Sequence, residues 1–484
     1  MKITFDMTKL DNGKLSPANV YVTFAAAAAD MVYGSESHIT FTNGTIAIQS
    51  KSYGTSTAYS LSDIATHGLK LNSATSLVGF ISYGSTAGIE LLGVGSQPNF
   101  LSNATPRYSI FEVSYGGSTG GADVTNISQF GGAIQIAFLS AGKVQTQVGN
   151  TADTTTLFNA LAGASGFSGE TSTATVYLDG NGRFVRIIGT NVFPNGTVQT
   201  PYATFNAYLQ SLFVANGVRS VVKELTNLEP GQKPGGKGSA GFKSTGTATN
   251  VTPDKIYNLD YHFDAIVTQV TKPSPPGNPN GTYRVTLNGY VNATLAGSDP
   301  TGIESYQYTG LSVTIAADDL AAGNLYMTNF IYQAATTGAG IDVTSSGWDA
   351  LNKDFGAANV NAAVLLKAAG DFAEGVTCGF PGSTVLSATS PSTALGDLAS
   401  YEWWENPLLA YAPAQPGNAY YSAYGNAVSA NSGGINGVAF SRGGVYGSPY
   451  DDRFSLNLIA PNAQTDEMRI TLLADGTLKP SGSS

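Results

Sequence analysis

Clusters of turn-forming residues recur about every ten positions along this chain, between short runs of β-branched and aromatic residues. The sequence shows neither a sustained heptad pattern nor an internal repeat of solenoid length. Only 12% of the 484 residues are charged, whereas glycine (58) and tyrosine (25) are abundant. This pattern predicts a β-rich protein with a large core and roughly two or three domains.

The stretch 108–136 contains two such runs, joined by the glycine-rich segment 116–121, and predicts a β-hairpin. Glu112 lies in the middle of the first run, where strand propensity disfavours an acid. If the hairpin closes symmetrically about Gly120, Glu112 lies opposite Ser128, with Cβ atoms roughly 5 Å apart. In that register Asp123 belongs to the turn and to the opposite face. We therefore expect functional chemistry at Glu112.

Two motifs resemble the glycoside hydrolase family 64 β-1,3-glucanases, which share a barrel with the thaumatin-like proteins. In that family a Glu in a Glu-Phe-Thr strand is followed sixteen residues later by an Asp. Here Glu112-Val113-Ser114 matches the first part, and the segment 125–131 (Thr-Asn-Ile-Ser-Gln-Phe-Gly) matches the second, with Ser128 at the Asp position. The segment 446–452 (Tyr-Gly-Ser-Pro-Tyr-Asp-Asp) resembles the Tyr-x-x-x-Tyr-Asp-Asp segment that closes the barrel. The middle of the chain is assigned only because it lies between the two motifs.

The resemblance implies a β-rich α+β fold, with a thaumatin-like β-barrel or sandwich and an inserted mixed α/β lobe that form a wide cleft for β-1,3-glucan. Apolar residues three and four apart predict helices at 154–162, 201–216 and 348–374, within the middle of the chain. We expect residues 1–150 to form the N-terminal part of the barrel. Residues 151–430 form the lobe, with an inserted β-hairpin at 256–315, and residues 431–484 complete the barrel.

The resemblance also implies an inverting mechanism, with Glu112 as the general acid and position 128 as the base. Such enzymes need one protonated and one ionised carboxyl, and a serine cannot act as the base at neutral pH without a partner. The usual base is therefore missing, and Asp123, Asp451 or Asp452 could replace it. In the alternative reading, Glu112 is held only by hydrogen bonds to neighbouring polar side chains.

Candidate substrate-binding residues flank the two motifs or lie in an aromatic segment before residue 430. Trp403 and Trp404 could stack on sugar rings, because pyranose C–H groups pack on aromatic faces. A position half in the core and half at the surface of a helix is the more ordinary role for either tryptophan. The candidates for substrate binding are Ser114, Thr125, Asn126, Ser128, Trp403, Trp404 and Tyr450.

Charge and composition exclude several partners. The formal net charge of −10 disfavours nucleic acid, and no apolar run is long enough to span a bilayer. The single cysteine, Cys378, allows no intrachain disulfide, and His38, His67 and His262 lack ligand spacing, so we expect no metal and no cofactor. No signal-peptide pattern precedes the first strand. We expect an extracellular or cell-surface location by resemblance, with a cytoplasmic location left open.

Three functions fit the sequence. The first is a β-1,3-glucanase that hydrolyses glucan, and the second is a catalytically inactive carbohydrate-binding protein on the same scaffold. The third is a structural or self-assembling surface protein, which the low charge and the many small polar residues would suit. The expected partner is accordingly a polysaccharide or other copies of the chain. The identity of position 128 separates the first two, because a Ser cannot supply the missing base.

Overall fold

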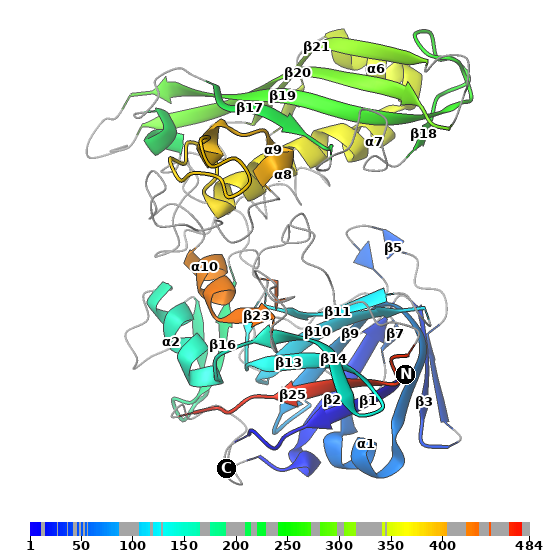
Figure 1. The fold of residues 1–484 in the computed structure, drawn as a ribbon, viewed down its shortest axis with the longest axis vertical. Coiled ribbons are helices and arrows are strands. Elements are labelled where there is room, and N and C mark those ends of the chain that lie inside the picture. Colours follow the sequence, from blue (N-terminus) through cyan, green and yellow to red (C-terminus); the bar gives the residue numbers. More distant parts are fainter. Residues whose placement is uncertain are drawn as a thin grey trace. The chain divides into compact units, whose positions relative to one another are not determined.

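In the computed structural model the chain divides into two compact units (Figure 1). The first unit comprises Met1–Val192, Gln199–Tyr202 and Ala423–Ser484, and the second comprises Phe193–Val198 and Ala203–Ser422. The structure describes residues 1–476 except 11–14, 27, 36, 42–45, 48–49, 52–53, 56, 87–105, 117–119, 127–128, 165–174, 190–208, 214–219, 229–240, 273–280, 298–303, 316–340, 344–345, 404–422, 435–444 and 447–463.

The first unit is built on one large mixed sheet, whose main path runs β23-β14-β13-β25-β1-β9-β10-β11-β24. The strands of this path, in chain order, are β1 (Lys2–Asp6), β9 (Leu69–Tyr83), β10 (Tyr108–Tyr115), β11 (Gly120–Thr125), β13 (Ile134–Ser140), β14 (Lys143–Asn150), β23 (Ser432–Gly434), β24 (Val445–Tyr446) and β25 (Glu467–Leu472). Five further strands extend it beside β9, namely β2 (Val20–Ala26), β3 (Ala28–Tyr33), β4 (Ser37–Phe41), β7 (Gly54–Thr55) and β8 (Tyr59–Ser60).

Strands from the two ends of the chain meet in the middle of this sheet. β1 pairs in parallel with β25, with Ile3 opposite Met468, and β25 pairs on its other side with β13 (Figure 1). Within the part of the chain that the structure describes, the path ends at β23 and β24 and does not close on itself. The β-rich prediction is confirmed, but the closed barrel is not observed, because the described parts of both end strands are only two or three residues long.

Strand β10 is buried on both of its faces. On one face Phe111 packs edge-on against Phe24, with ring centroids 6.5 Å apart and an interplanar angle of 83°. On the other face Ile110 joins a cluster with Phe80 and Tyr108, which also includes Ala25. A strand with apolar neighbours on both faces has a nearly continuous run of hydrophobic residues, as 108–113 shows. This burial makes the one acid in β10 a chemically unusual position.

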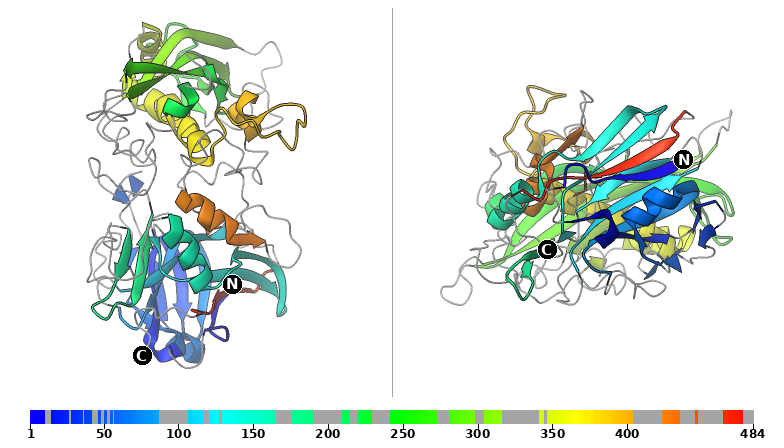
Figure 2. Two further views of the ribbon diagram at one scale, coloured as in Figure 1. Left: turned by 90° about the vertical axis from the view of Figure 1, so that its left-hand side faces the viewer. Right: turned by 90° about the horizontal axis from the view of Figure 1, so that it is seen from below.

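Helices and small sheets complete the first unit. α2 (Thr154–Ala164) packs beside α10 (Ala423–Ala430), as Figure 2 shows, and confirms the helix predicted at 154–162. The first stretch of this unit ends at Val192. The remaining elements are η1 (Pro17–Asn19), α1 (Leu61–His67), the sheet of β12 (Gln129–Phe130), β15 (Val176–Leu178) and β16 (Phe184–Ile188), and the pair β5 (Ile46–Ala47) and β6 (Ser50–Lys51).

The second unit contains a six-stranded antiparallel sheet. The long β19–β20 hairpin confirms the strands predicted at 256–271 and 282–293, because alternate residues of β19 from Tyr257 to Val267 are buried. In order β17-β19-β20-β21-β22, with β18 beside β19, the strands are β17 (Ser220–Thr226), β18 (Phe242–Lys243), β19 (Ile256–Thr271), β20 (Thr282–Leu295), β21 (Ser305–Ile315) and β22 (Ile341–Val343).

The helices of the second unit confirm the prediction at 348–374, including its break at Gly356. The C-cap of the last helix in this run is Gly379, and Gly375 lies inside α8. A Cβ atom at Gly375 would stand 2.5 Å from the Trp403 ring, so this glycine permits a close approach rather than a helix end. The helices are α6 (Ser346–Phe355), α7 (Ala357–Val360), η2 (Asn361–Leu365), α8 (Leu366–Cys378), η3 (Leu395–Asp397) and α9 (Ser400–Trp403).

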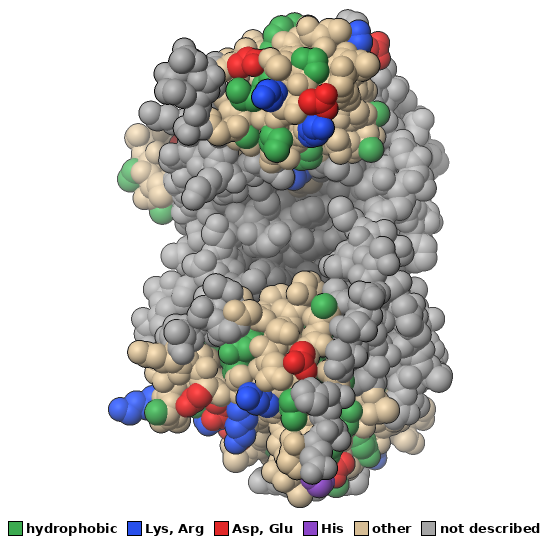
Figure 3. All heavy atoms as spheres, turned by 90° about the vertical axis from the view of Figure 1, so that its right-hand side faces the viewer, with side chains coloured by type: hydrophobic (Ala, Val, Ile, Leu, Met, Phe, Trp, Pro, Cys, Tyr) green, Lys and Arg blue, Asp and Glu red, His purple; other side chains and the backbone are tan. Residues whose placement is uncertain are grey.

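Acidic and basic side chains lie interspersed on the described surface that Figure 3 shows. Among the helices that the structure describes, none is both long and apolar enough to cross a membrane.

Candidate functional site

The β10–β11 hairpin places Glu112 directly opposite Asp123. The strands pair Tyr115 with Gly120 and Ser114 with Gly121, so only four residues lie in the turn. Gly120 adopts a φ of +128°, and a Cβ atom at this position would stand 2.0 Å from the carbonyl oxygen of Ser114. Only glycine fits this close return of the chain.

This register corrects the expectation that Ser128 faces Glu112. The correction follows from the position of Gly120, which begins the return strand and is not the centre of the turn. Asp123 therefore shares a face with Glu112 and does not belong to the turn, contrary to the expectation. Ser128 itself lies outside the described residues.

Thr125 connects the two acids. It follows Asp123 by two positions and so lies on the same face of β11. Its Oγ1 donates a hydrogen bond to Asp123 Oδ1 at 2.9 Å, and it lies 3.4 Å from Glu112 Oε1. The two carboxylate oxygens can therefore be at most about 6 Å apart, the sum of these distances.

The environment treats the two carboxyls differently. Asp123 is only 4% exposed, whereas Glu112 is half-buried. Burial raises the pKa of Asp123 well above its ordinary value, and the neighbouring charge of Glu112 raises it further, while the hydrogen bond from Thr125 opposes the shift. The pair therefore favours a neutral Asp123 beside the negative charge of Glu112.

Apolar residues form the surroundings of the pair on its β9 side. Val78 lies directly across from Glu112 on β9, and it packs against the cluster that includes Phe80 and Ile110. Such a setting lowers the local dielectric and strengthens interactions between charges. On the other side, Thr125 is the register partner of Tyr446 in the parallel strand β24.

Two further predicted residues lie beside the pair. Ser114 Oγ accepts a hydrogen bond of 3.2 Å from the backbone nitrogen of Ser76, at an irregularity in the β9–β10 pairing. Asn126 follows β11, and its carbonyl oxygen accepts a 2.7 Å hydrogen bond from the hydroxyl of Tyr424 in α10. Its side-chain nitrogen is buried and has no hydrogen-bond partner. Glu112, Ser114, Thr125 and Asn126 are thus brought together by one hairpin.

Trp403 lies in the core of the second unit. Its side chain is fully buried, its Nε1 donates to the carbonyl oxygen of Leu395 at 2.9 Å, and its ring stacks on Phe380. A sugar has no access to that ring in this structure. Four other predicted site residues lie outside the described part of the chain: Trp404, Tyr450, Asp451 and Asp452.

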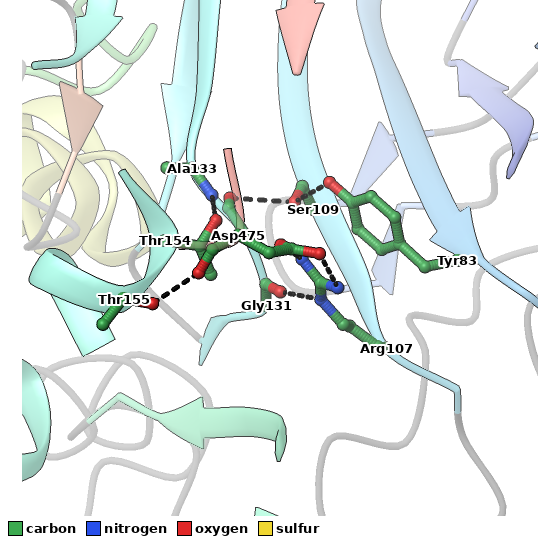
Figure 4. Close-up of polar contacts among 9 residues, drawn as sticks. Tyr83, Arg107, Ser109, Gly131, Ala133, Thr154, Thr155 and Asp475 are labelled. Carbon is green, nitrogen blue, oxygen red and sulfur yellow. Dashed lines mark hydrogen bonds and ion pairs between the residues drawn. The ribbon is translucent and has the colours of Figure 1, made fainter. Parts of the chain in front are cut away.

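A buried ion pair lies next to the start of β10 (Figure 4), and no motif of the sequence predicted it. Arg107 donates from Nη2 and Nη1 to the carboxylate of Asp475 at 2.5 and 3.1 Å, and from Nε to the carbonyl of Gly131. The guanidinium lies 4.1 Å from the ring centroid of Tyr83, whose hydroxyl is 2.9 Å from Ser109 Oγ. These contacts join the segment around Asp475 to the start of β10, the strand that carries Glu112.

Sequence reasoning placed Asp123 on the wrong face because it assumed a longer turn. A shorter turn, in which Tyr115 pairs with Gly120, places Asp123 opposite Glu112. The glycine-rich segment 116–121 was the signal in the sequence that allows such a turn. For metal binding, the described residues contain no group of three or more His, Cys, Asp or Glu side chains suited to an ion.

No protein-family model and no curated protein matches this chain. Among solved structures, it is similar to a GH64 β-1,3-glucanase domain from Clostridium beijerinckii, with 12% identity over 97% of this chain and 98% of that chain and a TM-score of 0.42. It is also similar to a laminaripentaose-producing β-1,3-glucanase in complex with laminaritetraose, with 10% identity, 98% of each chain covered and a TM-score of 0.40. Similarity of this extent assigns no residue a role.

Proposed function

We propose that this protein is a β-1,3-glucanase-like glycoside hydrolase that acts at Glu112. The observation that carries the proposal is the facing pair of Glu112 and Asp123, joined through Thr125. In glycosidases a carboxyl that its surroundings keep neutral holds the catalytic proton beside an ionised carboxyl, and in this pair Asp123 is the neutral member. The Glu-Val-Ser and Tyr-x-x-x-Tyr-Asp-Asp motifs of the sequence point to β-1,3-glucan as the substrate.

Glu112 is assigned to the glycosidic oxygen, because it is the more accessible of the two acids. Asp123 lies too deep to activate a water on the far side of a sugar. The oxygens of the pair that face Thr125 are at most about 6 Å apart, which is short of the roughly 6.5–9.5 Å that an inverting acid and base require. Asp123 therefore supports the acid and does not replace the missing base.

Asp451 or Asp452 is the proposed base for an inverting reaction. The support is the pairing of β24 with β11, which sets Tyr446 beside Thr125. Asp451 follows Tyr446 by five positions, and five residues of extended chain span less than about 20 Å. Hydrolysis then needs Glu112 to protonate the leaving oxygen and the ionised Asp to take a proton from water.

A sugar contact is proposed for Ser114, which is half-buried and lies on the same strand as Glu112. Thr125 and Asn126 are buried and are assigned to holding the hairpin in place. Ser128, Trp404 and Tyr450 remain candidates from the sequence alone. Trp403 is withdrawn because it is buried. An extracellular or cell-surface location would suit such a substrate and stays a prediction.

The test is the release of reducing sugar from laminarin by the purified protein and its variants. Glu112→Gln is expected to lower the rate by about 10²–10⁴-fold, the usual contribution of a general acid. Asp254→Asn is the matched control, since it changes an exposed carboxyl that pairs with Lys243 in the second unit. A wild-type protein that binds laminarin without releasing sugar would overturn hydrolysis and favour the inactive carbohydrate-binding function. A protein that neither binds nor releases would overturn both.

A further inference from the structure

Thr125 holds a position between two groups that compete for one proton. Its Oγ1 lies within hydrogen-bonding distance of Asp123 Oδ1 and of Glu112 Oε1, at 2.9 and 3.4 Å. A threonine hydroxyl carries one proton to donate and two lone pairs that accept. It can therefore donate to only one of the two acids at a time.

Because the Thr125 hydroxyl has only one proton to donate, the hydrogen bonds run in one direction when Asp123 is neutral. A neutral carboxyl has its own O–H to donate, and an ionised carboxylate only accepts. The arrangement that satisfies all three groups has Asp123 donating to Thr125 Oγ1, and Thr125 donating to Glu112. The buried Thr125 hydroxyl thus links a proton donor to a proton acceptor in one direction.

We propose that Thr125 is a positioning residue that relays the proton held by Asp123 to Glu112, before Glu112 passes it to the leaving glycosidic oxygen. The proposal rests on the proposed function and adds the source of the proton to it. A direct transfer between the acids is less suited, because the hydroxyl of Thr125 lies within reach of both carboxyls.

The proton balance of the relay is closed by the water that hydrolysis consumes. The O–H bond of Asp123 breaks as Thr125 Oγ1 gains that proton, and the original Thr125 proton forms a new O–H bond on Glu112. Glu112 then protonates the leaving oxygen, and both acids are ionised. Water adds its hydroxide to the anomeric carbon and gives its proton to the base, which then returns it through solvent to the pair.

The groups that face the pair across β9 and β24 are uncharged, so Glu112 is the charge that shifts the pKa of Asp123. Across β9 the neighbour of Glu112 is the uncharged Val78, and across β24 the register partner of Thr125 is Tyr446. Within the described part of the chain, Glu112 is the one charged group that acts on the carboxyl of Asp123. The relay therefore depends on three side chains of a single hairpin.

The experiment compares Thr125→Val, which removes the hydroxyl at nearly constant shape, with Thr125→Ser, which keeps it. Carboxyl ¹³C NMR follows the titration of Asp123 and Glu112 in each protein, without substrate. Thr125→Val is expected to raise the pKa of Asp123 further, because the ionised carboxylate loses a donor hydroxyl and this loss outweighs that of the weaker hydrogen bond made by the neutral carboxyl. Thr125→Ser is expected to titrate like the wild type. Thr146→Val is the control, since the Thr146 hydroxyl on β14 has no hydrogen-bond partner.

The second readout is the laminarin rate as a function of pH. Thr125→Val is expected to lower kcat by at least about tenfold with KM unchanged, and Thr125→Ser is expected to restore it. Equal titration curves in the wild type and Thr125→Val would overturn the relay whether or not glucan is cleaved. Altered titration in a protein that releases no sugar would instead overturn the proposed function and leave only the coupling of the two acids. A sugar-releasing protein whose kcat is the same in Thr125→Val would also overturn the relay.

Discussion

Arg107 and Asp475, which stand 368 positions apart in the sequence, form a two-point ion pair in the interior of the first unit. The Arg107 side chain is 1% exposed, and its third contact is the carbonyl of Gly131. The pair joins the last described segment of the chain to the beginning of β10, five residues before Glu112. Its integrity therefore affects both the stability of the unit and the position of the site.

Removing one partner of this pair is expected to destabilise the first unit strongly. Asp475→Ala leaves the Arg107 guanidinium buried without a counter-charge, which typically costs about 3–5 kcal/mol. The measurement is urea unfolding followed by a probe specific to the first unit. The matched control is Asp254→Ala, which breaks the pair of Lys243 and Asp254, with side chains 65% and 64% exposed, and should change stability by less than about 1 kcal/mol. Equal losses in both variants would contradict the assignment.

The stability of the first unit is expected to fall as pH rises above the ordinary Asp pKa of 3.8, because of Asp123. The folded state holds the proton of Asp123 to a higher pH than the unfolded state does, since burial and Glu112 raise its pKa. Between the two pKa values the folded state binds more protons, so each rise in pH favours unfolding. Asp123→Asn keeps the shape, cannot ionise and should abolish this part of the pH dependence.

Melting temperatures of the wild type and Asp123→Asn between pH 4 and neutrality check this prediction. Asp254→Asn provides the comparison, because the exposed Asp254 lies in the other unit. A wild-type curve that matches Asp123→Asn throughout that range would show that the folded pKa is not raised.

Two helical glycines are expected to respond oppositely to the same substitution. Gly375→Ala places a Cβ atom 2.5 Å from the Trp403 ring and should cost about 1–3 kcal/mol through overpacking. Gly163→Ala in α2 meets no atom within 4 Å and should gain about 0.5–1 kcal/mol from helix propensity. Thermal unfolding of each variant gives both values, and a stabilising Gly375→Ala would contradict the packing of Trp403.

The sequence predicted elements well where periodicity is strong and turns are clear. The β19–β20 hairpin is an example, since its alternation is long and a run of Pro, Asn and Gly separates its strands. The strand around Glu112 was predicted for the same reason. The register of its hairpin was not, because a glycine-rich segment allows several turn lengths and each shift changes which residue faces Glu112.

Other features depend on contacts that no local pattern encodes. The pairing of Arg107 with Asp475 joins segments from opposite ends of the chain, and neither residue lies in a recognisable motif. Trp403 was predicted at a surface for its chemistry, yet its packing against Phe380 and over Gly375 decides its place. Tertiary packing thus determined these positions, and residue type alone did not.

The parallel pairing of β1 with β25 also sets the order in which the chain can fold during its synthesis. β25 is made last but belongs in the centre of the sheet, between β1 and β13. The first unit must therefore wait, with its earliest strands unpaired on one side, until more than 460 residues have been made. The second unit is nearly continuous in sequence and has no such delay. It is therefore free to fold on the ribosome while the sheet of the first unit still lacks its last strands.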